Sequence, residues 1–301
     1  MQLVVTGGTG RIGSALVRAL RERADTTRLL TRNPARAQSG DPAIQAVRWD
    51  PLEGPAPAEA LAGADAVVHL AGEDVAQRWT RDAKRRIRES REIGTRNLVA
   101  GLRAAEPRPR VLVASSAVGY YGPHGDERLD ESAPPGSDFL AQVCVAWERE
   151  AAAAAELGVR VVHLRTGVVL DREGGALARM LPFFQAGAGG PVAGGKQYLS
   201  WIHRDDLVGM IVAALDGDGW RGPVNASAPE PVTNRDFSRA LGRALHRPAV
   251  APVPAFAVRL LYGDMAEIVT TGQRAVPARA LALGYEFRHP ALDEALASAL
   301  G

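Results

Sequence analysis

Short apolar runs alternate with segments of helical periodicity over the first three quarters of the chain. Buried strands are predicted at residues 3–5, 27–31, 44–49, 65–70, 110–115, 159–164 and 223–226. Helical spacing is found at 14–20, 81–105, 139–157 and 207–215, the last introduced by residues 200–206, and a proline- and alanine-rich helix ends at Gly63. Strands that alternate with helices in this way predict an α/β fold with a doubly wound parallel sheet.

The first strand runs directly into a glycine-rich turn, TGGTGRIG at residues 6–13. Gly7 permits the turn, Gly10 lets a pyrophosphate approach the backbone, and Gly13 lets the following helix pack closely on the strand. Free N–H groups of the first helical turn then face the anion. The spacing is G-x-x-G-x-x-G rather than G-x-G-x-x-G, but its place between a strand and a helix predicts a dinucleotide site of the Rossmann type. The residues assigned to this site are Gly7, Thr9, Gly10, Arg11, Ile12 and Gly13.

The end of the second strand favours NADP(H) over NAD. An NAD-selective site carries a carboxylate there, whereas this chain reads Thr31-Arg32-Asn33-Pro34. A guanidinium at Arg32 suits a 2′-phosphate. Asp50, after the third strand, has two open interpretations: it accepts a hydrogen bond from the adenine amino group, or it only starts a turn before Pro51.

Small residues follow the fourth and fifth strands. Ala71 and Gly72 would let the nicotinamide-side ribose come close, and Ser115 ends the fifth strand at the same edge. His69, within an apolar strand, is expected to be a packed core histidine. The basic run at 84–91 is expected to be a solvated helix face, with one or two side chains turned toward a phosphate as the open alternative.

Beyond Leu170 the regular pattern breaks. Residues 174–195 are rich in glycine and predict a loop that lines a cleft, and residues 248–300 predict a small lobe over the sheet edge. We therefore expect an NADP-binding Rossmann domain of residues 1–172 and 200–227. The smaller C-terminal substrate lobe would comprise residues 173–199 and 228–301.

Composition excludes several classes of protein. Lys+Arg 36 against Asp+Glu 34 leaves a charge of +2, so neither nucleic acid nor a membrane surface is an expected partner. The single cysteine, Cys144, excludes an internal disulfide and a cysteine-rich metal site, and we expect no metal. No secretory signal pattern or membrane-length apolar run is present, so a cytoplasmic location is expected. The expected oligomeric state is a monomer or a homodimer.

The chain resembles the extended short-chain dehydrogenase/reductases of the NAD(P)-dependent epimerase/dehydratase group, and within them an atypical epimerase-like branch. The motifs that carry the resemblance are TGGTGxIG at 6–13, TRxP at 31–34, WDP at 49–51, LAGE at 70–73, RW at 78–79 with SR at 90–91, WIHxxDL at 201–207, APxPVTN at 228–234 and RPA-PVPAFA at 247–257. The resemblance implies bound NADP(H), with further contacts from Thr31, Arg32, Leu70, Ala71, Arg91 and the Val169 region. It also implies a small-molecule substrate under the C-terminal lobe.

One part of the superfamily pattern is missing. Active members carry Tyr-x-x-x-Lys after the fifth strand, with the tyrosine as acid/base. The two lysines here are Lys84 and Lys196, and the residues four positions before them are Thr80 and Val192. Weak candidates for another acid are Ser116, Tyr121 and His203. Ser116 alone is a poor acid, and the other two have structural alternatives. Tyr121, like Tyr120, is a packing residue or part of a substrate-pocket wall, and His203 caps the helix that follows it. Cys144 is expected only to pack.

Two functions follow from these observations. The favoured hypothesis is an NADP(H)-dependent oxidoreductase that acts on a carbonyl or hydroxyl compound without the usual Tyr/Lys pair. The alternative is a non-catalytic NADP(H)-binding sensor or scaffold protein.

Overall fold

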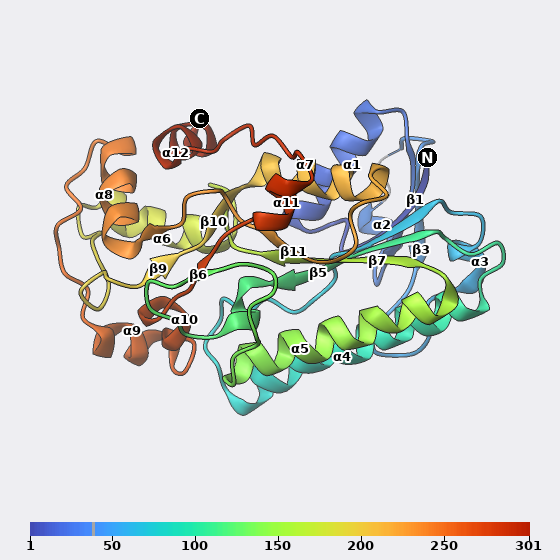
Figure 1. Cartoon of the computed structure of the whole chain (residues 1–301), viewed down its shortest axis with the longest axis horizontal. Coiled ribbons are helices and arrows are strands. Elements are labelled where there is room, and N and C mark those ends of the chain that lie inside the picture. Colours follow the sequence, from blue (N-terminus) through green and yellow to red (C-terminus); the bar gives the residue numbers. More distant parts are fainter. Residues whose placement is uncertain (38–39) are drawn as a thin grey trace.

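The computed structural model describes residues 1–37 and 40–301. A parallel sheet of seven strands forms its centre, in the order β11-β7-β5-β4-β1-β2-β3 (Figure 1). The strands are β1 (Gln2–Thr6), β2 (Thr26–Thr31), β3 (Ile44–Arg48), β4 (Ala66–His69), β5 (Val111–Ala117), β7 (Arg160–Thr166) and β11 (Gly222–Ala226). Each predicted strand is present within two residues of its expected bounds, and the strand order reverses between β1 and β4, so the doubly wound prediction is confirmed.

Helices cover both faces of this sheet (Figure 1). Alternation along β1 decides which side chain meets which layer: Leu3 and Val5 share one core with α1 and α7, whereas Val4 enters the core beneath α3 and α4. The helices and 3₁₀ turns of this part are α1 (Arg11–Glu22), α2 (Pro34–Ala37), α3 (Ala58–Leu61), α4 (Arg81–Ala104), η1 (Val118–Tyr121), α5 (Phe139–Ala152), η2 (Ala153–Leu157) and α7 (Arg204–Asp216).

The remaining elements gather beyond the carboxyl ends of the strands. They are β6 (Arg128–Leu129), β8 (Val168–Leu170), α6 (Gly175–Gln185), β9 (Tyr198–Leu199), β10 (Trp201–His203), β12 (Val232–Thr233), α8 (Asn234–Ala244), α9 (Ala255–Tyr262), α10 (Ala266–Thr270), β13 (Arg274–Ala275), α11 (Ala278–Ala282) and α12 (Leu292–Leu300). A core that contains Leu181, Trp201 and Phe237 holds this lobe together. Ala280 of α11 instead packs into the core of the central sheet. The division into two domains stays a prediction.

The prediction that residues 174–195 form a loop is wrong for its first half. Helix α6 occupies Gly175–Gln185 and buries Leu177, Leu181 and Phe184 on one side. The glycines that suggested a loop lie at the ends of this helix, and its interior has helical spacing. The stabilisation gained by burying that apolar face therefore outweighs the low helix propensity of the glycines in the segment and of Pro182 within the helix.

The segment that was expected to begin a helix at residues 200–206 starts instead as a strand. Trp201 is completely buried, and β10 pairs in parallel with β8. Helix α7 begins only at Arg204, where the His203 ring accepts a hydrogen bond from the Asp205 N–H at 3.1 Å. Burial of a large aromatic side chain favours the extended conformation here.

His69 is a packed core histidine, as expected. It is completely buried, with Nδ1 2.7 Å from the Thr6 hydroxyl and Nε2 3.0 Å from the Thr95 hydroxyl. Burial lowers the pKa of His69 to about 4. The imidazole is therefore neutral in the folded chain over the physiological range of pH.

This lowered pKa predicts acid destabilisation. In the unfolded chain His69 takes up a proton below about pH 6.5. In the folded protein its imidazole stays neutral down to about pH 4. The free energy of unfolding is highest above pH 6.5 and falls by about 3 kcal/mol toward pH 4 through this residue. Urea unfolding at pH 7.0 and 4.5 measures the loss. The decrease in unfolding free energy between the two pH values should be smaller in His69→Asn. An equal decrease in the variant and the unaltered protein would contradict the assignment of this pH dependence to His69.

Candidate functional site

At two positions of the glycine turn, Gly7 and Gly13, the backbone geometry is compatible only with glycine. Gly7 has φ +70°, and the Gly10 N–H donates to the Gly7 carbonyl at 2.9 Å. A Cβ on Gly13 would lie 2.2 Å from the Gly7 carbonyl oxygen and 2.7 Å from Gly8 Cα. The first turn of α1 is thereby drawn against the end of β1, and no acidic side chain lies in that turn. Its N–H groups are suited to an anion.

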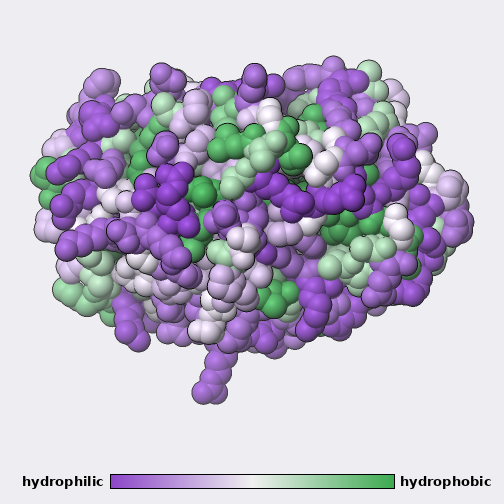
Figure 2. All heavy atoms as spheres, in the orientation of Figure 1, coloured by the Kyte–Doolittle hydropathy of each residue, from purple (hydrophilic) through white to green (hydrophobic). Residues whose placement is uncertain are grey.

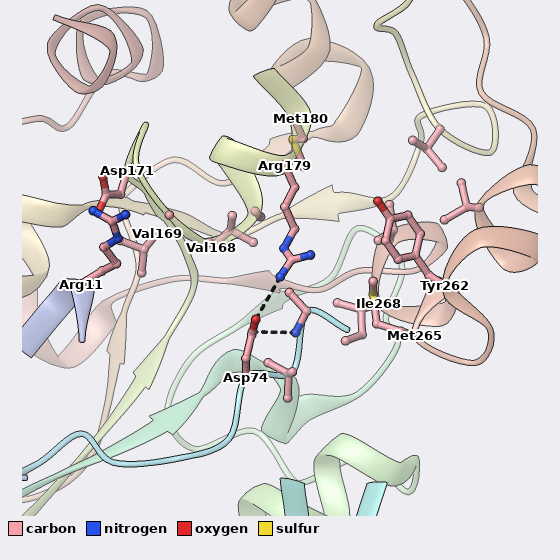
Figure 3. Close-up of a pocket in the computed structure, with 18 of the residues that line it drawn as sticks. Arg11, Asp74, Val168, Val169, Asp171, Arg179, Met180, Tyr262, Met265 and Ile268 are labelled. Atoms are coloured by element: carbon pink, nitrogen blue, oxygen red, sulfur yellow. Dashed lines mark hydrogen bonds and ion pairs between the residues drawn. The ribbon is translucent and has the colours of Figure 1, made fainter. Parts of the chain in front are cut away.

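A cavity of about 690 Å³ lies beyond this turn, between the sheet edge and the C-terminal lobe (Figure 3). Its volume is in the range of small-molecule and cofactor sites. The predicted cofactor residues that line it are Gly7, Gly10, Arg11, Ile12, Gly13, Leu70, Gly72, Arg91, Ser115 and Val169. The structure thus brings together residues from five separate segments of the sequence. Thr9, Thr31, Arg32, Asp50 and Ala71 are not among the described residues of the lining.

Arg32 and Asp50 follow β2 and β3 at the same edge of the sheet as the glycine turn, outside the described lining of the cavity. Thr6 is paired in register with Leu30, so Arg32 extends from the same edge of the sheet and is exposed. Asp50 Oδ1 accepts a hydrogen bond from the Leu52 N–H at 3.0 Å. This contact is that of a turn-starting aspartate, and the adenine contact stays a prediction.

Arg91 is the member of the basic run that turns inward. Its guanidinium donates to the carbonyls of Glu73 (3.0 Å) and Ile87 (3.2 Å) and lies 4.9 Å from the Trp147 ring centroid. A Cβ on Gly72 would touch this guanidinium at 3.3 Å. Burial lowers the pKa of Arg91 from its usual value. A partly desolvated cation therefore faces the cavity at the end of β4.

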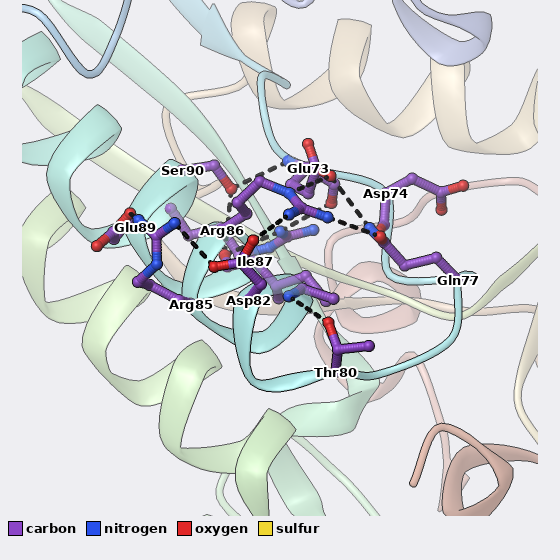
Figure 4. A network of polar contacts seen from close by, with 12 residues as sticks. Glu73, Asp74, Gln77, Thr80, Asp82, Arg85, Arg86, Ile87, Glu89 and Ser90 are labelled. Carbon is purple, nitrogen blue, oxygen red and sulfur yellow. Dashed lines mark hydrogen bonds and ion pairs between the residues drawn. The ribbon is translucent and has the colours of Figure 1, made fainter. Parts of the chain in front are cut away.

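The other side chains of this run are surface ion pairs. Arg85 bonds to Asp82 and Glu89, and Arg86 bonds to Glu73 (Figure 4). Glu73 also accepts from the side chain of Gln77 at 3.1 Å. These contacts fix the loop after β4 to the first turns of α4.

Ser116 and Tyr121 are held in a buried network. The Ser116 hydroxyl donates to Glu148 at 2.6 Å, and Glu148 is paired through two hydrogen bonds, at 2.8 and 2.9 Å, with Arg165. The Tyr121 hydroxyl donates to Asn225 at 2.7 Å, and burial raises its pKa. Neither side chain is part of the described cavity lining. The packing interpretation of Tyr121 agrees with this arrangement.

His203 likewise lies outside the described lining of the cavity. It caps α7, and its ring faces His289 at a centroid distance of 3.8 Å. Burial lowers the pKa of His203, and the neighbouring His289 lowers it further. Asp205 completes a group whose ligand atoms lie within 4.8 Å of one another. The two imidazole rings are tilted by 40° to each other.

An apolar cluster lies at the start of α5, where a Tyr-x-x-x-Lys motif would begin. Trp79, Ile87, Val143 and Met265 form it, with Phe139 packed against them. The Trp79 and Phe139 rings meet edge to face at 5.1 Å. Cys144 is buried in the same helix, and burial raises the pKa of its thiol to about 12. The expected packing role of Cys144 is confirmed.

Several polar residues of the cavity were not predicted from the sequence, among them Asp74, Arg179 and Tyr262. Asp74 and Arg179 form a 3.0 Å ion pair that joins the loop after β4 to α6 across the cavity, and Tyr262 projects from α9 (Figure 3). Asp74 follows the LAGE motif directly and was within reach of sequence reasoning. Arg179 lies in the segment predicted to be a loop, and Tyr262 lies in a lobe helix without a recognised motif.

The fold and the cavity together define a nucleotide-binding protein of the Rossmann class with a lobe over the carboxyl edge of its sheet. Comparison with known proteins makes this more specific. The model of the NAD dependent epimerase/dehydratase family matches residues 3–224, and a domain of unknown function (DUF1731) matches residues 253–299. The chain belongs to the NAD dependent epimerase/dehydratase family.

Relatives match over nearly the whole chain. The chloroplastic epimerase family protein SDR39U1 homologue of Arabidopsis thaliana is 43% identical over 98% of this chain and 86% of its own length. A crystal structure of human epimerase family protein SDR39U1 with NADPH has 35% identity and a TM-score of 0.88, with 100% of both chains covered. A nucleoside-diphosphate sugar epimerase from Corynebacterium glutamicum has 34% identity and a TM-score of 0.80, over 100% of this chain and 58% of that one.

Within residues 1–37 and 40–301, no helix combines the length and the apolar character that crossing a membrane requires.

Proposed function

We propose that this chain is an NADP(H)-dependent oxidoreductase acting on a carbonyl or hydroxyl compound. The proposal rests on the glycine turn: Gly7 and Gly13 bring the first N–H groups of α1 to one end of a cavity whose volume is in the range of cofactor and small-molecule sites. The human relative solved with NADPH supports the choice of cofactor. The two hypotheses drawn from the sequence both require this binding step.

The residues fit NADPH in three places. The glycine turn binds the diphosphate, Arg32 pairs with the 2′-phosphate, and Arg91 with Gly72 forms the wall beside the nicotinamide-side ribose. When bound, NADPH supplies a hydride to an electrophilic carbon. The substrate oxygen then gains negative charge in a cavity that contains the guanidinium groups of Arg91 and Arg179. These cations would stabilise that oxygen electrostatically. In place of the usual tyrosine, water would supply the proton that completes the hydroxyl group, because the lining residues Phe183, Leu261 and Ile268 are exposed to solvent.

Arg32 is expected to select the phosphorylated cofactor. Replacement by glutamate removes the partner of the 2′-phosphate and places a carboxylate where a ribose 2′-hydroxyl is recognised in NAD sites. We expect Arg32→Glu to weaken NADPH binding about 30-fold or more and to strengthen NADH binding, a change in preference of about 2 kcal/mol at least. Titrations that follow cofactor fluorescence measure both affinities. Arg36→Glu, in the neighbouring α2, is the matched control; if it has the same effect, general charge is responsible rather than Arg32.

Turnover is tested with NADPH-loaded protein and a panel of ketones, aldehydes and sugars. Loss of absorbance at 340 nm that depends on one class of compound supports the oxidoreductase. Arg179→Met should then lower kcat more than it raises KM, because a cation that meets a developing charge acts in the transition state. No substrate-dependent oxidation with any class contradicts the proposal.

A non-catalytic NADP(H)-binding sensor is the second candidate. Ser116 is tied to Glu148, and apolar side chains surround the start of α5. A sensor requires unequal affinity for NADP⁺ and NADPH, since a ligand shifts an equilibrium only by its differential affinity. Equal affinities measured by calorimetry, together with turnover in the panel, would exclude it.

A further inference from the structure

The part of the cavity enclosed by the lobe is apolar. Its walls come from four helices, α6, α8, α9 and α10, and from the turns beside them. Their apolar side chains include Met180, Phe184, Val258, Leu261, Met265 and Val269. Met180 and Met265 are two of the four methionines in the chain. Methionine is flexible and polarizable, so these side chains adapt to apolar ligands of different shape.

Several polar groups of this half already have partners within the chain, whereas the Tyr262 hydroxyl has no hydrogen bond among the described residues. Asn234 Oδ1 accepts from the Val192 N–H at 2.8 Å, and the Ser238 hydroxyl donates to the Asn234 carbonyl at 2.8 Å. Arg179 donates to Asp74 through Nη2 at 3.0 Å, and its other N–H groups, which have no partner among the described residues, can meet a single ligand oxygen. A sugar with several hydroxyl groups would need unpaired donors and acceptors here, since burying such groups without partners is costly.

Charge balance argues against a second diphosphate. The described lining contains three carboxylates, from Glu73, Asp74 and Asp171, and three guanidinium groups, from Arg11, Arg91 and Arg179. Arg11 is itself paired with Glu173 at 2.8 Å. The proposed cofactor already brings its own phosphates to the glycine turn. A nucleotide sugar would add a further diphosphate to a cavity without net positive charge.

Exposed apolar side chains surround the mouth of the cavity. Phe183 (52% exposed), Leu261 (60%) and Ile268 (39%) belong to the lining, although each is open to solvent. In the face that Figure 2 shows, hydrophobic residues lie at the lower left, in the region where Figure 1 labels α9. Isolated apolar side chains are ordinary on a surface, but a group at a cavity mouth is typical of a binding site.

We infer that the substrate of this site is a predominantly hydrocarbon or aromatic compound that carries one carbonyl or hydroxyl group, and not a nucleotide sugar. The inference rests on the proposed function for the role of the single oxygen. The hydrocarbon body lies among the methionine, valine and leucine side chains of the lobe, where its burial contributes binding energy in proportion to its apolar area. Its oxygen lies toward Arg179 and Arg91.

The test uses the whole chain saturated with NADPH. The neutral fluorophore N-phenyl-1-naphthylamine reports the apolar site, and the competitors are a medium-chain aliphatic ketone, an aromatic aldehyde and UDP-glucose. We expect saturable binding of the fluorophore and its displacement by the ketone and the aldehyde, with none by UDP-glucose at the same concentration. Displacement by UDP-glucose, or no saturable fluorophore binding, would overturn the inference.

Neighbouring leucines on α9 supply a matched pair of variants. Leu261 lines the cavity mouth, whereas Leu260, 73% exposed, does not belong to the described lining. Because both side chains are exposed, glutamate at either position is compatible with folding. Leu261→Glu should weaken binding of the fluorophore and the ketone at least tenfold, and Leu260→Glu should change it less than twofold. Equal effects would assign the binding to the outer surface and overturn the inference.

The measurements distinguish a failure of the proposed function from a failure of the inferred substrate class. NADPH affinity, followed by the fluorescence of the cofactor, should be unchanged in both leucine variants. If the unaltered protein does not bind NADPH, the proposed function fails, and the fluorophore titration without cofactor still tests the apolar cavity. If NADPH binds and the apolar compounds do not, only the substrate class is wrong.

Discussion

Arg165→Met is expected to lower the free energy of unfolding by about 3–5 kcal/mol. The side chain is 4% exposed and pairs with Glu148, itself 11% exposed. Arg165 also lies over the Tyr120 ring, at 3.4 Å from its centroid, and donates to the Tyr121 hydroxyl at 3.1 Å. Removal of the guanidinium leaves the Glu148 carboxylate with the Ser116 hydroxyl as its one hydrogen-bond partner among the described residues. This uncompensated charge accounts for most of the loss.

Two further variants distinguish this cause from loss of packing. The double variant Arg165→Met/Glu148→Leu removes both charges and should recover most of the lost stability in urea unfolding. Arg243→Met removes an ion pair of similar length with Asp293, but both partners are largely exposed, so the cost should stay below about 1 kcal/mol. A double variant as unstable as Arg165→Met would show that the methylene stem and the ring contact matter more than the charge.

The same network explains why the catalytic candidates could not be chosen from the sequence. Ser116 follows Ser115 in the chain, but alternation along β5 turns neighbouring side chains to opposite sides, so Ser115 lines the cavity and Ser116 meets Glu148. Glu148 lies on α5 and Arg165 on β7. Their pairing depends on strand order and register, which a single sequence does not specify.

The cofactor edge was predictable for a different reason. Its residues lie at strand ends, and the carboxyl ends of parallel strands meet at one edge whatever the details of packing. Gly7, Leu70 and Ser115 therefore line the same cavity although they come from three strands. The lobe follows no such rule. Helix α6 and the Asp74–Arg179 pair arise from contacts between segments far apart in the chain, and the glycine content of residues 174–195 gave no sign of them.

Gly13→Ala should reduce NADPH affinity at least 100-fold, about 3 kcal/mol. Helix propensity alone favours the opposite result, because alanine stabilises a helix interior by about 1 kcal/mol relative to glycine. Steric contact outweighs this gain: the added Cβ would lie 2.2 Å from the Gly7 carbonyl oxygen and 2.7 Å from Gly8 Cα, both backbone atoms. The turn must move, and with it the N–H groups that face the diphosphate.

A second glycine variant provides the control for this prediction. Gly54 lies in a surface turn, and a Cβ there would have no atom within 4 Å, so Gly54→Ala should bind NADPH as the unaltered protein does. Circular dichroism at the assay temperature confirms that both variants are folded before the fluorescence titration. If Gly13→Ala is folded and binds NADPH within fivefold of the unaltered protein, the glycine turn does not hold the diphosphate. The cofactor would then have to bind elsewhere along the cavity, because the close approach of α1 to β1 is the feature from which its placement follows.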